Sequence, residues 1–245
     1  MRHLSAQAIS LVAIVVVWAI VSAVVGSRIF PGPGQVAPEF TGLIASGEFA
    51  GPLVQSLSRT ALGFMVGFIA GVAIGIASAK APWFKVSTSP LLSIALFAPT
   101  LVVIFLGIAI LGTSLLSIAL ITGVTVAPNV AIFMRDVMSD FDPDLVDMSN
   151  AYRVPTGQRV KDLYLPYLIP AMLAAARIGF SMSWKVIMLA EVFGFPGGLG
   201  FKIRINYTVY NLTALLAWLI VFVLALLIIE QFLRIAERRI VRWQP

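Results

Sequence analysis

The chain alternates long apolar runs with short polar segments, and the length of the runs decides its class. Six runs are each about 18 residues long or longer, which is enough for a helix to cross the hydrocarbon core of a bilayer. They are Ala8–Val25, Ala61–Ala79, Leu91–Leu111, Leu115–Phe133, Tyr167–Ala190 and Leu212–Ile229. The pattern therefore predicts an all-α membrane protein with six transmembrane helices.

Residues 1–50 are predicted to hold the first span and an external loop. Arg2 before an apolar run is also typical of a cleaved signal peptide. The run is long, however, and no small-x-small cleavage site follows it, which favours a retained helix. Gly and Pro are frequent in residues 26–50, as in a loop, and a surface helix is expected over Pro38–Gly47. Residues 51–240 are predicted to form the main membrane domain.

Glycines recur at four-residue intervals in the second predicted span, at Gly63, Gly67, Gly71 and Gly75. On a helix they form one smooth stripe, which lets another helix approach closely. We expect this stripe to serve packing rather than ligand binding.

Prolines interrupt the third and fourth predicted spans at Pro99-Thr100 and Pro128-Asn129. Such breaks free backbone groups that need polar partners, and they often line a pathway. Simple kinks are the alternative interpretation. Thr100 is therefore one candidate residue of a substrate pathway.

Basic residues lie mostly on one side of the predicted spans, and this bias sets the orientation. Outside we expect Arg28, Lys202 and Arg204, with Arg59 at the outer edge of the second span. Inside we expect Arg2, Lys80, Lys85, Arg135, Arg153, Arg159, Lys161, Arg234, Arg238, Arg239 and Arg242. Both termini and the segment 135–166 are thus predicted to face the cytoplasm.

The longest polar segment between two apolar regions runs from Asp142 to Pro170. Asp142 is suited to cap a short helix with Pro143 at its first position. Leu145, Met148 and Tyr152 would share one face, with acidic residues such as Asp147 on a stripe beside it. An amphipathic helix between two spans is suited to lie in a groove of a soluble partner. A solvated connector is the alternative.

The fifth predicted span carries a polar face made of Arg177, Ser181, Trp184 and Lys185. A charge in a membrane helix costs at least about 2.5 kcal/mol and usually faces a cavity or a partner. Lys185 could form a cationic wall for an anionic substrate. Alternatively, Arg177 pairs with a carboxylate or a lipid phosphate, and Lys185 pairs with Glu191. At the outer edge Glu191 is suited to a gate or to a salt bridge with Arg59.

Composition removes several classes of function. Hydrophobic residues make up 60% of the chain and charged residues 11%, which is unlike a soluble domain. There is no cysteine, the one histidine is His3 in the N-terminal tail, and no Gly-Lys dipeptide exists that could form a phosphate-binding loop. We therefore expect no cofactor, no metal site, no enzymatic activity and no nucleic-acid partner.

The polar segment resembles the cytoplasmic motif of permeases of binding-protein-dependent ABC importers. That motif reads Glu-Ala-Ala, a Gly four residues after the second Ala, and then Ile-x-Leu-Pro. Its ending is matched by Leu163-Tyr164-Leu165-Pro166. Asp147-Met148-Ser149 replaces Glu-Ala-Ala, and Arg153 stands at the Gly position.

Four further stretches resemble the nitrate, sulfonate and taurine subgroup of these permeases, so that the likeness covers roughly residues 50–245. They are Ala174–Gly179, Ser183–Glu191, Gly197–Phe201 and Glu237–Trp243. The resemblance implies the type I ABC importer transmembrane fold over residues 51–240, with a coupling segment at 135–166. It implies a multi-pass protein of the bacterial inner membrane.

The resemblance also implies partners and a mechanism. Two copies of the chain would enclose the pathway in the bilayer, two separate ATPase subunits would dock from inside, and an external binding protein would deliver a small anionic solute. The expected ATPase-coupling residues are Leu145, Asp147, Met148, Tyr152, Arg153 and Gly157. The expected pathway residues are Thr100, Ser181, Trp184, Lys185 and Glu191. A secondary transporter is the main alternative, although no inverted repeat and no central carboxylate is visible in the spans.

Overall fold

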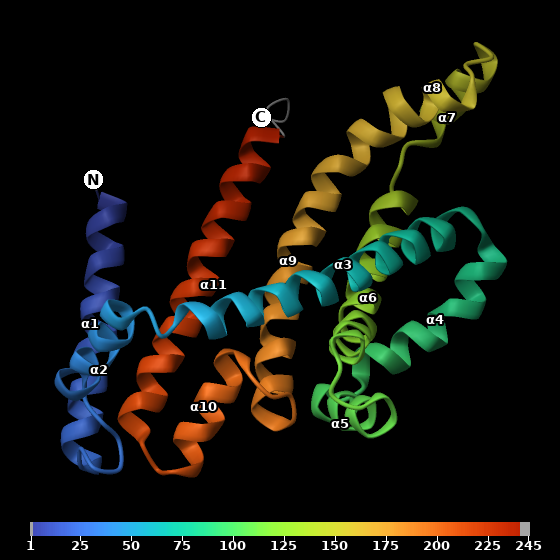
Figure 1. The fold of residues 1–245 in the computed structure, drawn as a ribbon. Helices are drawn as coiled ribbons and strands as arrows, with labels where there is room; N and C mark the ends of the chain where they lie inside the picture. The colour runs from blue at the N-terminus through green and yellow to red at the C-terminus, as the bar shows by residue number, and fades with distance from the viewer. Residues whose placement is uncertain (1, 241–245) are drawn as a thin grey trace. The chain divides into compact units, whose positions relative to one another are not determined.

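The computed structural model describes residues 2–240, which fold almost wholly into helices (Figure 1). The helices are α1 (Arg2–Val25), α2 (Pro33–Ser46), α3 (Ala50–Lys80), α4 (Pro82–Phe97), α5 (Thr100–Leu111), α6 (Leu115–Ser139), α7 (Pro143–Ala151), α8 (Thr156–Arg159), the π-helical turn η1 (Val160–Tyr164), α9 (Leu165–Phe193), α10 (Gly198–Thr208) and α11 (Leu212–Ile240). Within residues 2–240 there is no strand. The predicted all-α class is confirmed.

Four helical stretches in the described part of the chain are long and apolar enough to cross a membrane. They are α3, α6, the run Thr156–Phe193 that ends with α9, and α11 up to Arg239. The pair α4 and α5 would be a fifth span if the two are counted as one. In α1 the apolar part is Val12–Val25, which is shorter than the others. The structure thus shows several membrane helices, and the count of six stays a prediction.

The predicted span Leu91–Leu111 is not one straight helix. The chain bends by 99° between α4 and α5. Ala98 is extended, with φ −62° and ψ 127°, as expected for a residue before a proline, and Pro99 then caps α5. Pro128, by contrast, lies inside an unbroken α6. Of the two predicted proline breaks, only the one at Pro99 is present.

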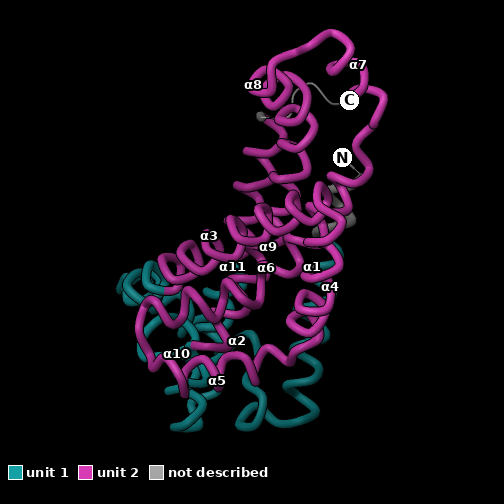
Figure 2. Tube along the Cα trace, turned by 90° about the vertical axis from the view of Figure 1, so that its right-hand side faces the viewer, with its two compact units in different colours: residues 1–55, 191–225 teal, residues 56–190, 226–245 magenta. Residues whose placement is uncertain are grey.

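The described chain divides into two compact units, shown in different colours in Figure 2. Unit 1 contains residues 1–55 and 191–225, and unit 2 contains residues 56–190 and 226–245. Each unit is built from segments far apart in the sequence, because α3, α9 and α11 each pass from one unit into the other.

The glycine stripe of α3 packs against α6 in unit 2, as the sequence predicts. Gly63, Gly67, Gly71 and Gly75 are all buried. A methyl group added at Gly71 would come within 2.6 Å of the Val130 Cβ, and the other three sites are equally close to α6. The absent side chains therefore allow the two backbones to approach closely.

In unit 1 two side chains fasten the segment before α2. The Trp18 indole N–H donates to the Pro31 carbonyl oxygen at 3.0 Å, and the Ser22 hydroxyl donates to the Phe30 carbonyl oxygen at 2.8 Å. Gly47 ends α2 with a left-handed φ of 71°. The expected surface helix is present and begins earlier than predicted, at Pro33, because a proline is well suited to the first turn of a helix.

Candidate functional site

Helix α7 starts as its sequence predicts. The Asp142 carboxylate accepts a hydrogen bond of 2.9 Å from the backbone N–H of Asp144, and Pro143 occupies the first helical position. These two residues satisfy or remove N–H groups that would otherwise lack partners at the start of the helix. A nine-residue helix is therefore well formed although it is short.

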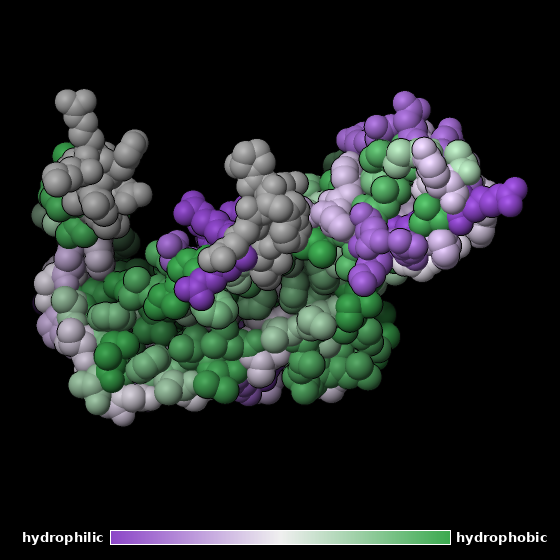
Figure 3. Space-filling model, turned by 90° about the horizontal axis from the view of Figure 1, so that it is seen from above, coloured by the Kyte–Doolittle hydropathy of each residue, from purple (hydrophilic) through white to green (hydrophobic). Residues whose placement is uncertain are grey.

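One face of α7 exposes large apolar side chains. Leu145, Met148 and Tyr152 are all exposed, and Tyr152 reaches 79%. Asp147 is exposed as well, while Ser149 is buried and donates to the Val146 carbonyl oxygen. Figure 3 shows hydrophilic residues gathered over the α7–α8 end of unit 2. This end is thus a polar surface with an apolar strip, as a docking helix requires.

The end of α7 is closed by two backbone hydrogen bonds around Arg153. The Val154 N–H donates to the Ser149 carbonyl oxygen, and the Arg153 N–H donates to the Asn150 carbonyl oxygen, both at 2.9 Å. This is the Schellman motif, in which the residue after the helix is left-handed. Arg153 has φ 51°, a conformation that suits glycine and strains other residues. The Gly position of the family motif is thus a left-handed position here.

Aromatic side chains join the base of this polar segment to the helices below it. The Phe141 ring packs against Tyr164 in a tilted arrangement and edge-on against Tyr167, with ring centroids 5.0 and 4.9 Å away. The Lys80 ammonium lies 4.7 Å from the Tyr164 ring centroid. The Tyr167 hydroxyl donates to the Val137 carbonyl oxygen at 3.0 Å. These contacts thus join the segment between α6 and α7 to α3, α6, η1 and α9.

A π-helical turn leads from this segment into α9. The N–H of Leu165 donates to the carbonyl oxygen of Val160, five residues earlier, which defines η1. The matched motif Leu163–Pro166 falls on η1 and the first turn of α9. Gly157 is exposed, and a methyl group there would meet no atom within 4 Å, so the structure gives no steric reason for a glycine.

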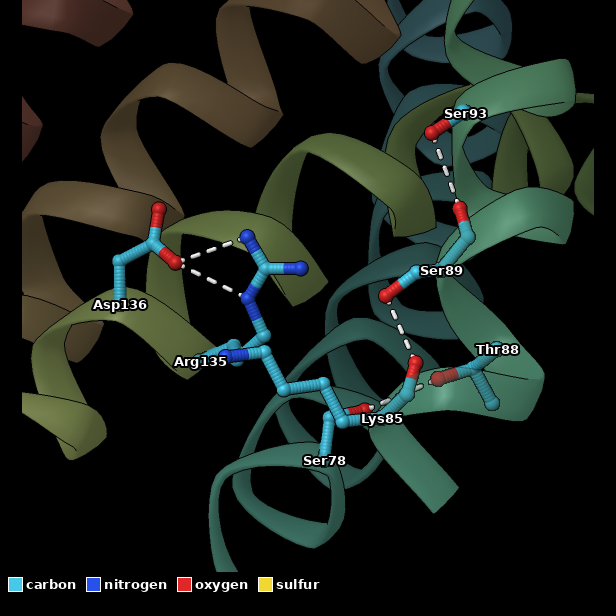
Figure 4. A network of polar contacts seen from close by, with 7 residues as sticks. All are labelled: Ser78, Lys85, Thr88, Ser89, Ser93, Arg135 and Asp136. Carbon is cyan, nitrogen blue, oxygen red and sulfur yellow. Dashed lines mark hydrogen bonds and ion pairs between the residues drawn. The ribbon is translucent and has the colours of Figure 1, made fainter. Parts of the chain in front are cut away.

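A second polar cluster joins α3, α4 and α6 in unit 2 (Figure 4). The hydroxyls of Ser78 and Thr88 lie 3.2 Å apart. Ser89 and Ser93 each donate to the carbonyl oxygen four residues earlier, and Arg135 pairs with Asp136 at 2.9 Å. The α4 hydroxyls of this cluster therefore have partners within their own helix or on α3.

A groove lies along α9 on the side of α11 in unit 2. Its volume is about 370 Å³. It is lined by Arg177, Ile178, Ser181, Met182, Lys185, Leu226 and Glu230. A smaller cavity of about 150 Å³ lies on the α6 side of the same helix face, next to Asn129. We call the first of these the α9 groove.

The two cations of the α9 groove differ in their partners. The Arg177 Nε lies 3.5 Å from the Glu237 carboxylate, so the predicted pairing of Arg177 with a carboxylate is confirmed. Lys185 is exposed and forms no ion pair or hydrogen bond within the described residues. Glu230 pairs with Arg234 at 3.5 Å. Lys185 is therefore the charge of this groove that remains open to a ligand.

Of the other predicted pathway residues, Ser181 lies in the groove with Lys185, and Thr100, Trp184 and Glu191 do not line it. Ser181 lines the groove, but Trp184 is only 1% exposed and points into the packed interior. Thr100 begins α5 after the bend. The polar face of α9 is therefore narrower than the sequence predicts: Arg177, Ser181 and Lys185 line the groove, and Trp184 is buried beside it.

Glu191 is fully buried and holds the start of α10 in unit 1. Its carboxylate accepts a hydrogen bond of 3.0 Å from the Gly200 N–H. Gly198 has φ 87°, and a side chain there would overlap this carboxylate. Glu191 therefore caps the N-terminus of a helix, where negative charge is favourable.

These features have a counterpart in one family of proteins. Residues 63–242 match the family described as the binding-protein-dependent transport system inner membrane component. The chain belongs to this family. It is an inner-membrane permease of a binding-protein-dependent ABC importer, and such permeases are non-catalytic subunits.

Several similar proteins are named as permeases for sulfonates, nitrate or taurine. The permease is similar to the putative aliphatic sulfonates transport permease protein SsuC of Bacillus subtilis, at 26% identity over 94% of this chain and 84% of that protein. It is also similar to the nitrate import permease protein NrtB of Synechocystis, at 23% identity over 96% of this chain and 88% of that protein. The taurine transport system permease protein TauC of Escherichia coli is 22% identical over 78% and 70%.

A solved structure shares the fold. The permease resembles a chain of the MetNI methionine ABC transporter in an inward-facing conformation, with a TM-score of 0.63 and 23% identity. The match covers 76% of this permease and 91% of that chain. The predicted type I importer fold is supported at this level.

Sequence reasoning missed three features of the site. The Phe141 aromatic contacts join residues more than 20 positions apart, and no periodicity shows them. The carboxylate partner of Arg177 was expected but not identified as Glu237. The left-handed Arg153 could have been found, because the family motif has glycine at that position.

Proposed function

We propose that this permease forms, as a homodimer, the translocation pathway of an ATP-driven importer for a small anionic solute. Two ATPase subunits would bind on the cytoplasmic side, and a soluble binding protein would deliver the solute from outside. Membership of a binding-protein-dependent family supports both partners. The proposed topology has six spans, with both termini in the cytoplasm of a bacterial cell.

The observation that carries this proposal is the exposed apolar strip of α7. Leu145, Met148 and Tyr152 are exposed at the polar end of unit 2. Large apolar side chains in the middle of an interface commonly supply most of its binding energy. We infer that this strip enters a groove of the ATPase, with Asp147 and Arg153 at the rim.

The mechanism follows from how this strip is attached. ATP-driven closure of the two ATPases would move both α7 helices together. The Phe141 contacts with Tyr164 and Tyr167 would pass this movement to α9, which lines the groove. The pathway would then open outward, and ATP hydrolysis would return it to the inward-facing state.

The choice of an anionic solute rests on Lys185. An unpaired ammonium on a membrane helix is costly unless water, a partner or a ligand solvates it. It faces a groove of about 370 Å³, large enough for a small organic or inorganic anion. The relatives are named for sulfonates, nitrate and taurine, which is consistent with this charge.

Co-purification of the ATPase with variants of the permease tests the docking strip. Met148→Asp places an unpaired charge in the apolar contact, so we expect the bound ATPase to fall at least about tenfold. Asp144→Asn is the matched control on the same helix, and a rim charge should matter little. If Met148→Asp retains both the ATPase and transport, α7 is only a connector. Docking would then have to occur elsewhere, near Lys80–Lys85 or Arg234–Arg239.

A secondary transporter is the alternative function. Its uptake would follow an ion gradient and would continue without ATP, whereas uptake by the proposed importer requires ATP and the binding protein. Transport by reconstituted proteoliposomes with and without internal ATP separates the two. Native mass measurement of the same complex tests the expected two permeases and two ATPases.

A further inference from the structure

A second strained residue follows Arg153 later in the sequence, directly after α10 in unit 1. The Tyr210 N–H donates to the Tyr207 carbonyl oxygen at 3.1 Å, and the Asn211 N–H donates to the Asn206 carbonyl oxygen at 2.9 Å. This is again a Schellman motif, and Tyr210 is its left-handed residue, with φ 56°. Within residues 2–240, Arg153 and Tyr210 are the two residues other than glycine with positive φ.

The tyrosine side chain adds nothing to this cap. Both hydrogen bonds use backbone atoms, and a glycine would adopt the same conformation without strain. The Tyr210 side chain is 85% exposed, so little packing offsets the strain. A bulky residue in this region is an outlier, and such outliers concentrate at binding sites.

Neighbouring side chains extend Tyr210 into a surface patch. Ile205, Tyr207 and Val209 are exposed as well, and together with Tyr210 we call them the α10 tip. Beside it, the Arg204 guanidinium lies 4.8 Å from the Phe201 ring centroid and has no carboxylate partner among the described residues. Exposed aromatic residues with an adjacent arginine are the composition that protein interfaces favour.

The helix that carries the α10 tip is held firmly at its other end. The buried Glu191 carboxylate caps it through the Gly200 N–H. Lys202 pairs with Glu48 at 2.9 Å and lies 5.4 Å from the Trp218 ring centroid. Aromatic side chains on a rigidly held helix lose little conformational entropy on binding, so they are preorganised for a partner.

We propose that the α10 tip is the docking surface for the soluble binding protein on which this family depends. This rests on the proposed function, because the predicted topology places α10 outside the cell. The partner should offer a recess for Tyr210 and a carboxylate for Arg204. Lipid headgroups are the competing occupant, since tyrosines also line membrane interfaces. Attachment to a bilayer would not require the tyrosine to adopt a left-handed backbone conformation. In addition, the polar residues Asn206 and Asn211 interrupt the apolar side chains of the α10 tip.

Two substitutions at one position separate binding from stability. In the reconstituted complex with its ATPase, the purified binding protein of the same system is titrated, and its concentration for half-maximal ATPase stimulation is measured. Tyr210→Gly should raise this concentration about tenfold or more, because an aromatic anchor is lost, while the melting temperature stays equal or rises. Tyr210→Phe keeps the ring and should stay within about threefold. An unchanged concentration for Tyr210→Gly would overturn the proposal.

Labelling of single cysteines tests the same surface without transport, and the permease contains no other cysteine. In right-side-out vesicles a membrane-impermeant maleimide should label Tyr210→Cys, and saturating binding protein should slow the labelling at least about fivefold. If labelling is slow and its rate does not change when the binding protein is added, the α10 tip lies in the lipid headgroup layer and the proposal is wrong. Labelling of Asn150→Cys instead of Tyr210→Cys would show that the proposed topology itself is reversed.

Discussion

The backbone N–H of Val154 donates to the carbonyl oxygen of Ser149 at 2.9 Å, and this bond confines Arg153 to a left-handed conformation. The strain belongs to the backbone, while the guanidinium extends into solvent. The two parts of the residue can therefore be separated by substitution.

Arg153→Gly should stabilise the folded permease. Glycine removes about 1 kcal/mol of left-handed strain, partly offset by its greater freedom in the unfolded chain, so the melting temperature should rise by a few degrees. Ala151→Gly, on the regular part of α7, is the control and should lower it. If Arg153 also contacts the ATPase, coupling should weaken in the more stable variant. A lower melting temperature for Arg153→Gly would show that the left-handed conformation of Arg153 does not destabilise the folded permease.

Lys185→Ala should reduce transport at least about tenfold, because it removes the open cation of the α9 groove. Assembly with the ATPase should persist, since Lys185 makes no ion pair in the described chain. Lys161→Ala, on η1 and away from the α9 groove, is the control for loss of a lysine. Transport in proteoliposomes and co-purification measure the two effects. A variant that fails to assemble would identify Lys185 as a structural residue.

Two glycines of α3 should respond in opposite directions to the same change. Gly71→Ala forces a methyl group against Val130 of α6 and should destabilise the permease by about 1–3 kcal/mol. At Gly51 no atom lies within 4 Å of the added methyl group, so Gly51→Ala should be neutral or stabilise by up to about 1 kcal/mol. Thermal unfolding in detergent measures both. Equal effects would show that α3 and α6 are not closely packed.

Glu191→Ala should destabilise unit 1 by about 1–3 kcal/mol, because the buried Gly200 N–H loses its acceptor. Glu191→Gln keeps an acceptor oxygen and should cost less. Gly198→Ala should be as harmful as Glu191→Ala, since its side chain would overlap the carboxylate at positive φ. Gly42→Ala in α2, where nothing lies nearby, is the control. If Glu191 caps α10, the melting temperatures of Glu191→Ala and Gly198→Ala should be the lowest, with Glu191→Gln above them and Gly42→Ala unchanged.

Local patterns were sufficient for most of the fold. Run length predicted the four long apolar helices, glycine spacing predicted the α3–α6 contact, and Asp142-Pro143 predicted the start of α7. The prolines show the limit: Pro99 ends a helix and Pro128 does not, although both stand in equally apolar runs. Pro128 is buried in the packed α6, whereas Pro99 is exposed, so tertiary packing decided between them. Glu191 likewise meets Gly200 only after the chain has turned, which no spacing rule reveals.

The π-helical turn η1 determines the direction in which α7 faces around the axis of α9. It contains one residue more than an α-helical turn would need, and one residue corresponds to a rotation of about 100°. A change of η1 into a regular turn would rotate α7 about that axis and would break the contacts of Tyr164 with Phe141 and Lys80. The extra residue of η1 therefore determines which way the apolar strip of α7 faces relative to α9.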